Sequence, residues 1–304
     1  MKKHLIYLGS RALGDCICAM PYLDLYSKKH KVEIHLLGDP NYGDLFDLSR
    51  LKGLFDKSYP NIKILSSEMN CEYEKIVELK FKFDKILQQS FAEALGFNNY
   101  SYIRPKMDSF KKERPIKNKY ITFGVHSTFQ MKYWNHPDGE KVQGESPYWN
   151  DLCRMFRKKT NLTPVCLSLD ETFGVPPYFN GLPKKAVKKI GMPFEDVINY
   201  IEHSEFYIGL SSGMSWVAHA LGKPVVMIAN FTDDKNEFDL NINDYIRITN
   251  KDVCHSCFGE ISKNTTFKGL KWDMCPKHQN TNRQFECHTS ITPEYVFDKI
   301  KDWI

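Results

Sequence analysis

The chain has 304 residues, of which 42% are hydrophobic and 13% aromatic, and its formal net charge at pH 7 is +5. A chain of this length and apolar content can form one large α/β unit or two domains, and wholesale disorder is excluded. Its apolar stretches are far shorter than the roughly 20 residues of a membrane-spanning helix, and the one at the N-terminus ends at Gly9, Ser10 and Arg11. The first residues therefore make a poor signal peptide, and we expect a soluble intracellular protein.

The first half of the chain alternates between apolar runs and apolar residues at helical spacing. Residues 4–8 predict a strand, residues 9–15 a glycine-containing loop, residues 16–29 a helix and residues 32–37 a second strand. This order is typical of a βαβ unit, in which a helix joins two parallel strands. Further elements are expected in the same half as strands at 62–65 and 75–79 and a helix at 83–95.

A basic segment at residues 104–119 separates this half from the next. Residues 1–120 carry 21 Lys and Arg against 15 Asp and Glu, whereas residues 121–304 carry 21 against 22. Much of the positive excess falls in the basic segment, which contains Pro105 and Pro115 and has little apolar periodicity. Either the segment is a linker with solvated charges, or it attracts an anionic partner to the first half.

A second α/β series follows the basic segment, with apolar runs and helical patterns in regular alternation. The strands are expected at 120–126, 163–169, 206–210, 224–229 and 245–249, and the helices at 148–159, 194–203 and 213–221. Two such series predict two Rossmann-like domains with mostly parallel sheets that face a cleft. Residues 136–147 and 171–192 are rich in Gly, Pro and Lys and are expected to be surface excursions.

The loop at residues 9–15 is the first candidate site. A glycine loop between a first strand and a first helix places backbone N–H groups at the carboxyl edge of the sheet, where ligands bind in open α/β sheets. Its spacing matches neither the dinucleotide-binding fingerprint nor a phosphate-cradling loop. Asp15 either caps the helix or acts as a general base toward an attacking hydroxyl. We expect Arg11 and Gly14 to lie on the acceptor side of this loop.

Small hydroxylated residues form the second candidate site, between the strand at 206–210 and the helix at 213–221. Gly213 permits close approach of a ligand to the backbone, and the exposed N–H groups and helix dipole favour a diphosphate. Helix capping alone would explain one serine, whereas this cluster contains three. The predicted donor-binding residues here are Ser211, Ser212, Gly213, Met214 and Ser215.

The third candidate site follows the strand at 120–126. Ser127, Thr128 and Lys132 would face the same cleft, because ligands bind beyond the carboxyl ends of parallel strands. Lys132 can neutralise the charge that develops on a leaving phosphate. The alternative is a surface lysine beside packed aromatic residues.

Four of the nine cysteines are clustered near the C-terminus, with the spacing Cys254-x2-Cys257-x17-Cys275-x11-Cys287. A Cys-x-x-Cys pair with two more distant cysteines supplies four soft ligands for one tetrahedral ion, and iron and zinc both suit four thiolates. Such a site would be structural, because four protein ligands leave no open coordination position. Disulfides or free thiols are the alternatives. The histidines that could replace a thiolate are His255, His278 and His288.

Taken together, these motifs resemble a known family. Leu13-Gly14-Asp15 followed by Ala19-Met20-Pro21-Tyr22, with the block from Ser212 to Pro224, looks like the ADP-heptose glycosyltransferases of family nine. The later motifs are similar to those of the bacterial autotransporter heptosyltransferases, which carry a four-cysteine iron finger. The motifs that carry this second resemblance are His126-Ser-Thr, Lys132-Tyr-Trp-Asn, Asn236-Glu-Phe, Cys254 and Cys257 with Phe258, Cys275-Pro-Lys-His, Arg283-Gln-Phe-Glu-Cys287 and Ile291-Thr-Pro-Glu.

The resemblance implies a GT-B fold and inverting transfer of a sugar from a nucleotide-diphosphate sugar, with ADP-heptose as the family's donor. By position, Asp15 matches the catalytic base, Lys132 matches the nucleotide-phosphate lysine, and Glu237 falls among the donor-binding residues. The start of the helix at 213–221 matches the donor-binding helix, and the four clustered cysteines match the family's metal ligands. The family's bacterial members carry an extra N-terminal domain, which we expect to be missing here because the βαβ opening starts at residue 4.

The expected domains are an acceptor domain at 1–115, a donor-binding domain at 116–253, a four-cysteine metal finger at 254–290 and a C-terminal helix at 291–304. The acceptor is left open. The resemblance implies a protein Ser or Thr, whereas the basic first half also fits a hydroxymethylated base of DNA, which would be flipped out of the stack as phage DNA glycosyltransferases require. A non-enzymatic nucleic-acid-binding module built on the cysteine finger is the third alternative. We expect a homo-oligomer in the cytoplasm of a bacterium or a phage-infected cell.

Overall fold

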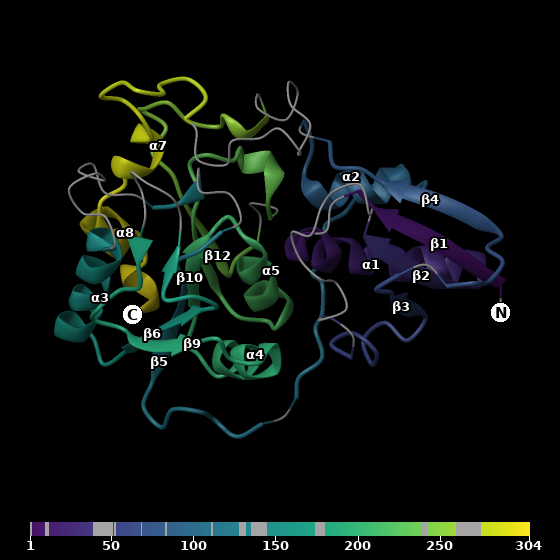
Figure 1. Ribbon diagram of the computed structural model, residues 1–304, viewed down its shortest axis with the longest axis horizontal. Coiled ribbons are helices and arrows are strands. Elements are labelled where there is room, and N and C mark those ends of the chain that lie inside the picture. The colour runs from purple at the N-terminus through teal and green to yellow at the C-terminus, as the bar shows by residue number, and fades with distance from the viewer. Residues whose placement is uncertain are drawn as a thin grey trace.

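The computed structural model has two α/β lobes, each built on a parallel sheet with helices packed against it (Figure 1). The N-terminus lies at the outer end of the first lobe, and the C-terminus lies in the second lobe beside its sheet. The residues that the structure describes are 2–9, 12–38, 51, 53–67, 69–82, 84–110, 112–127, 132–134, 145–173, 180–238, 242–259 and 275–304. In those ranges no helix combines the length and the apolar character needed to cross a membrane.

Four parallel strands form the sheet of the first lobe, in the order β3-β2-β1-β4. β1 pairs with β2 in the register Lys2 to Val32 and with β4 in the register His4 to Lys75. The βαβ opening that the sequence predicts is therefore confirmed. The elements of this lobe are β1 (Lys2–Leu8), α1 (Leu13–His30), β2 (Val32–Gly38), β3 (Ile62–Ile64), β4 (Lys75–Leu79) and α2 (Leu87–Ala94).

Six parallel strands form the sheet of the second lobe, in the order β12-β11-β10-β5-β6-β9. Its strands are β5 (Tyr120–Gly124), β6 (Thr163–Ser168), β9 (Val187–Ile190), β10 (Tyr207–Leu210), β11 (Val225–Ile228) and β12 (Tyr245–Ile248). Its helices are α3 (Pro147–Lys159), α4 (Phe194–Glu202), α5 (Gly213–Ala220), α7 (Glu286–Thr289) and α8 (Pro293–Lys299), with short 3₁₀ turns at Asp234–Asn236 and Lys301–Trp303. Strands β5, β10 and β11 are buried at every residue, as expected of parallel strands that are covered on both faces.

The prediction that residues 171–192 form only a surface excursion is wrong in part. Val187–Ile190 forms β9, the edge strand that pairs with β6, and a short antiparallel pair precedes it, β7 (Thr172–Phe173) with β8 (Asn180–Gly181). Two of the four residues of β9 are lysines, and an edge strand tolerates charged side chains because it is open to water. Of the other predicted excursion, residues 136–144 lie outside the described residues.

Helix α1 lies between its own sheet and the second lobe, and it is buried along most of its length. Ile17, Met20 and Leu23 are fully buried, and the apolar cluster that contains them continues into the second lobe through Trp216 and Val217 of α5. The two lobes therefore share one core, and packing of apolar side chains sets their relative position.

The basic segment at 104–119 runs from the first lobe to the second, and its described residues, 104–110 and 112–119, form no helix or strand. Arg104 pairs with Asp244 at 2.6 Å and donates to the His219 carbonyl at 2.8 Å. Further ion pairs with the second lobe join Lys112 to Asp196 at 2.8 Å and Arg114 to Glu205 at 3.6 Å. Three of the seven basic side chains of the segment thus pair with acidic side chains of the second lobe, which favours the linker interpretation.

Candidate functional site

The N-terminal ends of α1 and α5 face each other where the two lobes meet. A Cβ on Gly213 would lie 2.7 Å from the Leu13 Cβ, and a Cβ on Gly14 would lie 2.6 Å from the Trp216 ring. Contacts this short are not tolerated, so the close approach of the helices requires glycine at both positions. The N-terminal N–H groups and the positive dipole ends of both helices therefore converge on one region, which favours an anionic ligand.

Asp15 lies in the first turn of α1, on the side of this region that belongs to the first lobe. The residue at the N-cap position is Ala12, whose side chain makes no capping hydrogen bond, and Asp15 stands three residues later. The interpretations of Asp15 as a helix cap and as a general base both stay predictions. Burial, and after it the charge of Asp15, raises the pKa of the Cys16 and Cys18 thiols behind it. The Asp15 carboxylate is itself partly exposed, and its charge reaches Lys132 of the second lobe.

Lys132, Ser211 and Glu237 form a buried polar cluster beyond the end of β10. The Lys132 Nζ donates to the Ser211 carbonyl at 2.9 Å and to the Ser211 Oγ at 3.0 Å. The Ser211 hydroxyl donates to the Glu237 Oε1, which lies 4.0 Å from the Lys132 Nζ. Burial lowers the pKa of Lys132, and the charges of Glu237 and Asp15 oppose that change. The interpretation of Lys132 as a surface lysine is wrong, because its side chain is only 12% exposed.

The other predicted donor-binding residues lie around this cluster. Ser212 is the extended residue at the start of α5, and Met214 packs against the shared core. Ser215 is fully buried, and its hydroxyl donates to the Leu210 carbonyl at 2.7 Å, so it is already engaged within the protein. Ser127 is also buried, beyond the end of β5. The predicted site residues that lie outside the described ranges are Arg11 and Thr128.

The cysteines predicted to bind a metal gather beside the second lobe. The Sγ atoms of Cys254 and Cys257 are 3.7 Å apart, and two sulfurs held about 2.3 Å from one tetrahedral ion would be about 3.8 Å apart. Burial raises the pKa of Cys287, and its neighbours Cys275, Cys257 and Cys254 raise it further. None of these cysteines is joined in a disulfide. The chemistry of this donor set therefore fits one soft cation.

A tighter group in the same region consists of Cys254, His278 and Glu286, whose ligand atoms lie within 4.8 Å of one another. The Glu286 Oε1 accepts from the Cys254 N–H at 3.0 Å, and Arg283 donates to both carboxylate oxygens at 2.6 and 2.9 Å. Hydrogen bonding from Arg283 holds the pKa of Glu286 below its usual range. His278 is thus the histidine placed to take part in a metal site, and the four-cysteine site stays a prediction.

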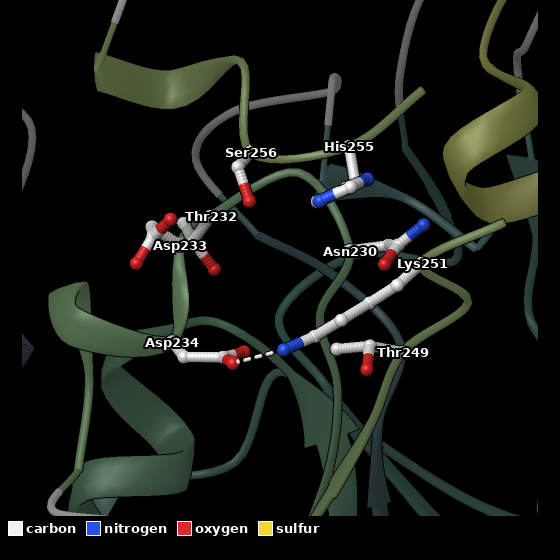
Figure 2. A pocket seen from close by; sticks show the side chains of 8 residues that line it. All are labelled: Asn230, Thr232, Asp233, Asp234, Thr249, Lys251, His255 and Ser256. Carbon is white, nitrogen blue, oxygen red and sulfur yellow. Dashed lines mark hydrogen bonds and ion pairs between the residues drawn. The ribbon is translucent and has the colours of Figure 1, made fainter. Parts of the chain in front are cut away.

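A small polar pocket lies beyond the carboxyl ends of β11 and β12 (Figure 2). Lys251 and Asp234 are paired across it at 2.5 Å, and Asp234 also lies 3.1 Å from the Arg247 Nε. The residues that line it are Asn230, Thr232, Asp233, Asp234, Thr249, Lys251, His255 and Ser256. None of the predicted donor-binding or acceptor-side residues is among them. This pocket is therefore distinct from the region where α1 and α5 meet.

Comparison with known proteins finds relatives over nearly the whole chain, although no model of a protein family matches it. The autotransporter heptosyltransferase BAHTCr of Citrobacter rodentium is 33% identical over 307 residues, which are 96% of this chain and 68% of that protein. The autotransporter heptosyltransferase Aah of Escherichia coli is 28% identical over 313 residues, which are 99% of this chain and 74% of that protein.

The fold is similar to that of a solved structure. The Escherichia coli heptosyltransferase TibC, described as dodecameric, iron-containing and in complex with ADP-D-β-D-heptose, aligns with a TM-score of 0.82 and 24% identity. The alignment covers 99% of this chain and 76% of TibC. The two-lobed α/β architecture is thus the GT-B fold that the sequence predicts.

Proposed function

This chain belongs to the autotransporter heptosyltransferases and is therefore a glycosyltransferase; from that premise we propose that it moves a sugar from a nucleotide-diphosphate donor onto a protein Ser or Thr, with inversion at the anomeric carbon. ADP-heptose is the first donor to test, because TibC is described in complex with it. The observation that carries the proposal is the meeting of α1 and α5, which brings Asp15 within electrostatic reach of the buried Lys132 cluster.

In the proposed reaction Asp15 is the general base. Its carboxylate takes the proton of the acceptor hydroxyl while the hydroxyl oxygen attacks the anomeric carbon. The bond from that carbon to the diphosphate oxygen breaks on the opposite face, and the electron pair leaves with the nucleotide diphosphate. Lys132 and the N–H groups at the start of α5 stabilise the developing negative charge, because they are positioned before the reaction begins.

The proposed division of labour follows the lobes. We assign residues 1–115 to acceptor binding and residues 116–253, with Ser211–Gly213 and Glu237, to donor binding. Residues 254–290 would form the metal finger, and residues 291–304 would close the second lobe against α3. The last assignment has support in the packing of Val296 and Ile300 into the core of the second lobe.

The metal that we propose is a structural iron held by Cys254, Cys257, Cys275 and Cys287. Iron is preferred to zinc because TibC is described as iron-containing. When bound, the ion would supply only cross-linking of two chain segments, because four thiolates fill a tetrahedral shell. Metal analysis of the purified chain tests this: Cys254→Ser is expected to lose the iron, and Cys71→Ser, a cysteine outside this region, is expected to keep it. Zinc in place of iron, or full iron content in Cys254→Ser, would contradict the assignment.

The acceptor and the donor are tested together by intact-mass spectrometry. The chain is incubated with a panel of nucleotide sugars and with candidate protein acceptors, and hydroxymethylated DNA serves as the comparison. We expect a mass increment of one sugar on Ser or Thr of a protein. An increment on DNA alone would contradict the protein acceptor. No increment with any donor, together with salt-dependent DNA binding, would contradict the enzyme and support a binding module. Light scattering of the same sample tests the proposed homo-oligomer, which the description of TibC as dodecameric supports.

A further inference from the structure

We propose that the cysteine region positions the phosphate-binding lysine, and that Phe258 and His288 are the two residues through which it does so. The cysteine region is defined here as residues 254–259 and 275–290, the parts that the structure describes. The inference goes beyond the proposed function, on which it rests, since it assigns to this region a task in donor binding in addition to the holding of a metal. Each positioning residue directly follows a cysteine, Phe258 after Cys257 and His288 after Cys287.

Phe258 places an aromatic face beside the Lys132 ammonium. The Lys132 Nζ lies 5.0 Å from the centre of the Phe258 ring, and a cation at this distance is attracted to the negative face of the ring. The attraction is strengthened here because little water reaches the Lys132 side chain, which is 12% exposed. Phe258 therefore favours one position of the ammonium, the same one in which Lys132 donates to Ser211.

The Phe258 ring is itself held from both lobes. Its backbone N–H donates to the Phe231 carbonyl at 3.1 Å, and its ring meets the Phe231 ring edge-on with 5.8 Å between centres. From the first lobe, the Phe81 ring beyond β4 lies 6.5 Å away, centre to centre. Because aromatic neighbours from both lobes hold the Phe258 ring, the ring can fix the position of a cation more precisely than a mobile ring could.

His288 fixes the backbone beside Lys132. Its Nδ1 is hydrogen-bonded to the carbonyl of Tyr133, the next residue after Lys132, and the imidazole is 1% exposed. A carbonyl oxygen only accepts, so the Nδ1 carries the proton and donates. The following residues reinforce this attachment: the Trp134 Nε1 donates to the Ile291 carbonyl at 2.7 Å. The backbone after Lys132 is therefore attached to the segment that carries Cys287.

The two contacts act on different parts of one residue. Phe258 acts on the end of the Lys132 side chain, and His288 acts on the backbone from which that side chain extends. They come from the two sections of the cysteine region, which are far apart in the sequence, so Lys132 keeps both contacts only while those sections stay together. The region thus contributes to donor binding through geometry, and neither residue needs to touch the donor.

Matched pairs of variants test the inference on the full-length chain. Phe258→Leu removes the aromatic face, whereas Phe258→Tyr keeps it. His288→Leu removes the N–H that donates to the Tyr133 carbonyl, whereas His288→Asn keeps an N–H near the Nδ1 position. For each variant we measure ADP affinity by calorimetry, the KM and kcat for the donor found active, the melting temperature and the iron content. ADP affinity and donor KM are expected to worsen about 3- to 30-fold in Phe258→Leu and to return to within about threefold of wild type in Phe258→Tyr. In the same way, ADP affinity and donor KM are expected to worsen in His288→Leu and to stay near those of wild type in His288→Asn.

Several outcomes separate this inference from the proposed function. If wild type binds ADP and transfers a sugar but Phe258→Leu and His288→Leu leave ADP affinity and KM within twofold, the inference is overturned and the function stands. If each pair of variants loses affinity equally, in step with its melting temperature, the two residues only support the fold and the inference is also overturned. A wild-type chain that neither binds a nucleotide nor transfers a sugar would overturn the proposed function itself.

Discussion

On the second-lobe side of the candidate site, Lys132, Ser211 and Glu237 are buried and already bonded to one another, whereas on the first-lobe side Asp15 is partly exposed in the first turn of α1. The donor side is thus preorganised, as is needed to stabilise the negative charge that develops on the leaving diphosphate in the transition state. On the acceptor side, Asp15 presents a carboxylate that is partly accessible to water. The two sides therefore have different tasks. Variants on the first-lobe side are expected to lose catalysis, and variants on the second-lobe side are expected to lose donor binding as well.

The largest expected effect is on the first-lobe side. Asp15→Asn keeps the shape of the side chain and removes the base, so kcat is expected to fall about 10²- to 10⁴-fold. ADP affinity is expected to stay within threefold of wild type, because the second lobe holds the donor. Steady-state kinetics and calorimetry measure the two quantities. A kcat within tenfold of wild type would show that another group accepts the proton.

On the second-lobe side, Lys132→Met is expected to damage binding and catalysis together. Loss of the ammonium should lower kcat about 10²- to 10³-fold and weaken ADP binding in the same variant. It also removes the ammonium that lies 4.0 Å from the buried Glu237 carboxylate, so the melting temperature should fall. The double variant Lys132→Met, Glu237→Gln separates these effects: we expect it to regain stability and not activity. Unchanged ADP affinity in Lys132→Met would remove Lys132 from the donor site.

A smaller effect is expected where the linker holds the two sides together. Arg104→Ala removes charge-assisted hydrogen bonds to Asp244 and to the His219 carbonyl, which should lower the free energy of unfolding by about 1.5–3 kcal/mol. The matched control is Lys112→Ala, whose ion pair is more exposed and is expected to contribute less. Urea unfolding measures both. Equal losses in the two variants would mean that Arg104 does not fix the lobes.

The effect that is smallest at neutral pH, because it develops only as the pH falls, is a pH dependence of stability. Burial, and then the Arg104 charge, lowers the pKa of His219 to about 3 from 6.5, so the folded chain keeps a neutral imidazole that the unfolded chain protonates below pH 6.5. Its contribution is therefore complete above pH 6.5 and is lost as the pH falls toward 3, by up to about 1.4 kcal/mol per pH unit. His219→Gln cannot be protonated and should reduce the slope. An unchanged slope in that variant would assign the acid sensitivity to other groups.

The parts of the fold that depend on local patterns could be predicted from the sequence. The βαβ opening, the strands around Tyr207–Leu210 and Val225–Ile228, and the glycine and serine turns have clear periodicity and punctuation. The prediction failed where local patterns mislead: two of the four residues of β9 are lysines, a composition that is typical of a surface excursion.

The contacts that build the site could be predicted only through residue types and resemblance. Lys132 and Ser211 are 79 positions apart, and Glu237 joins them from a third segment. The aromatic contact from Phe258 and the carbonyl contact from His288 have no signal of their own in the sequence, because any packed core contains similar residues. Such pairings arise from the tertiary fold, which a single sequence does not disclose.

A crystal structure of the chain with a non-transferable analogue of the donor tests the proposed site most directly. We expect the diphosphate between the Lys132 Nζ and the start of α5, with the anomeric carbon facing Asp15. A donor bound in the polar pocket around Asp234 and Lys251, or with its anomeric carbon turned away from Asp15, would contradict the proposed site.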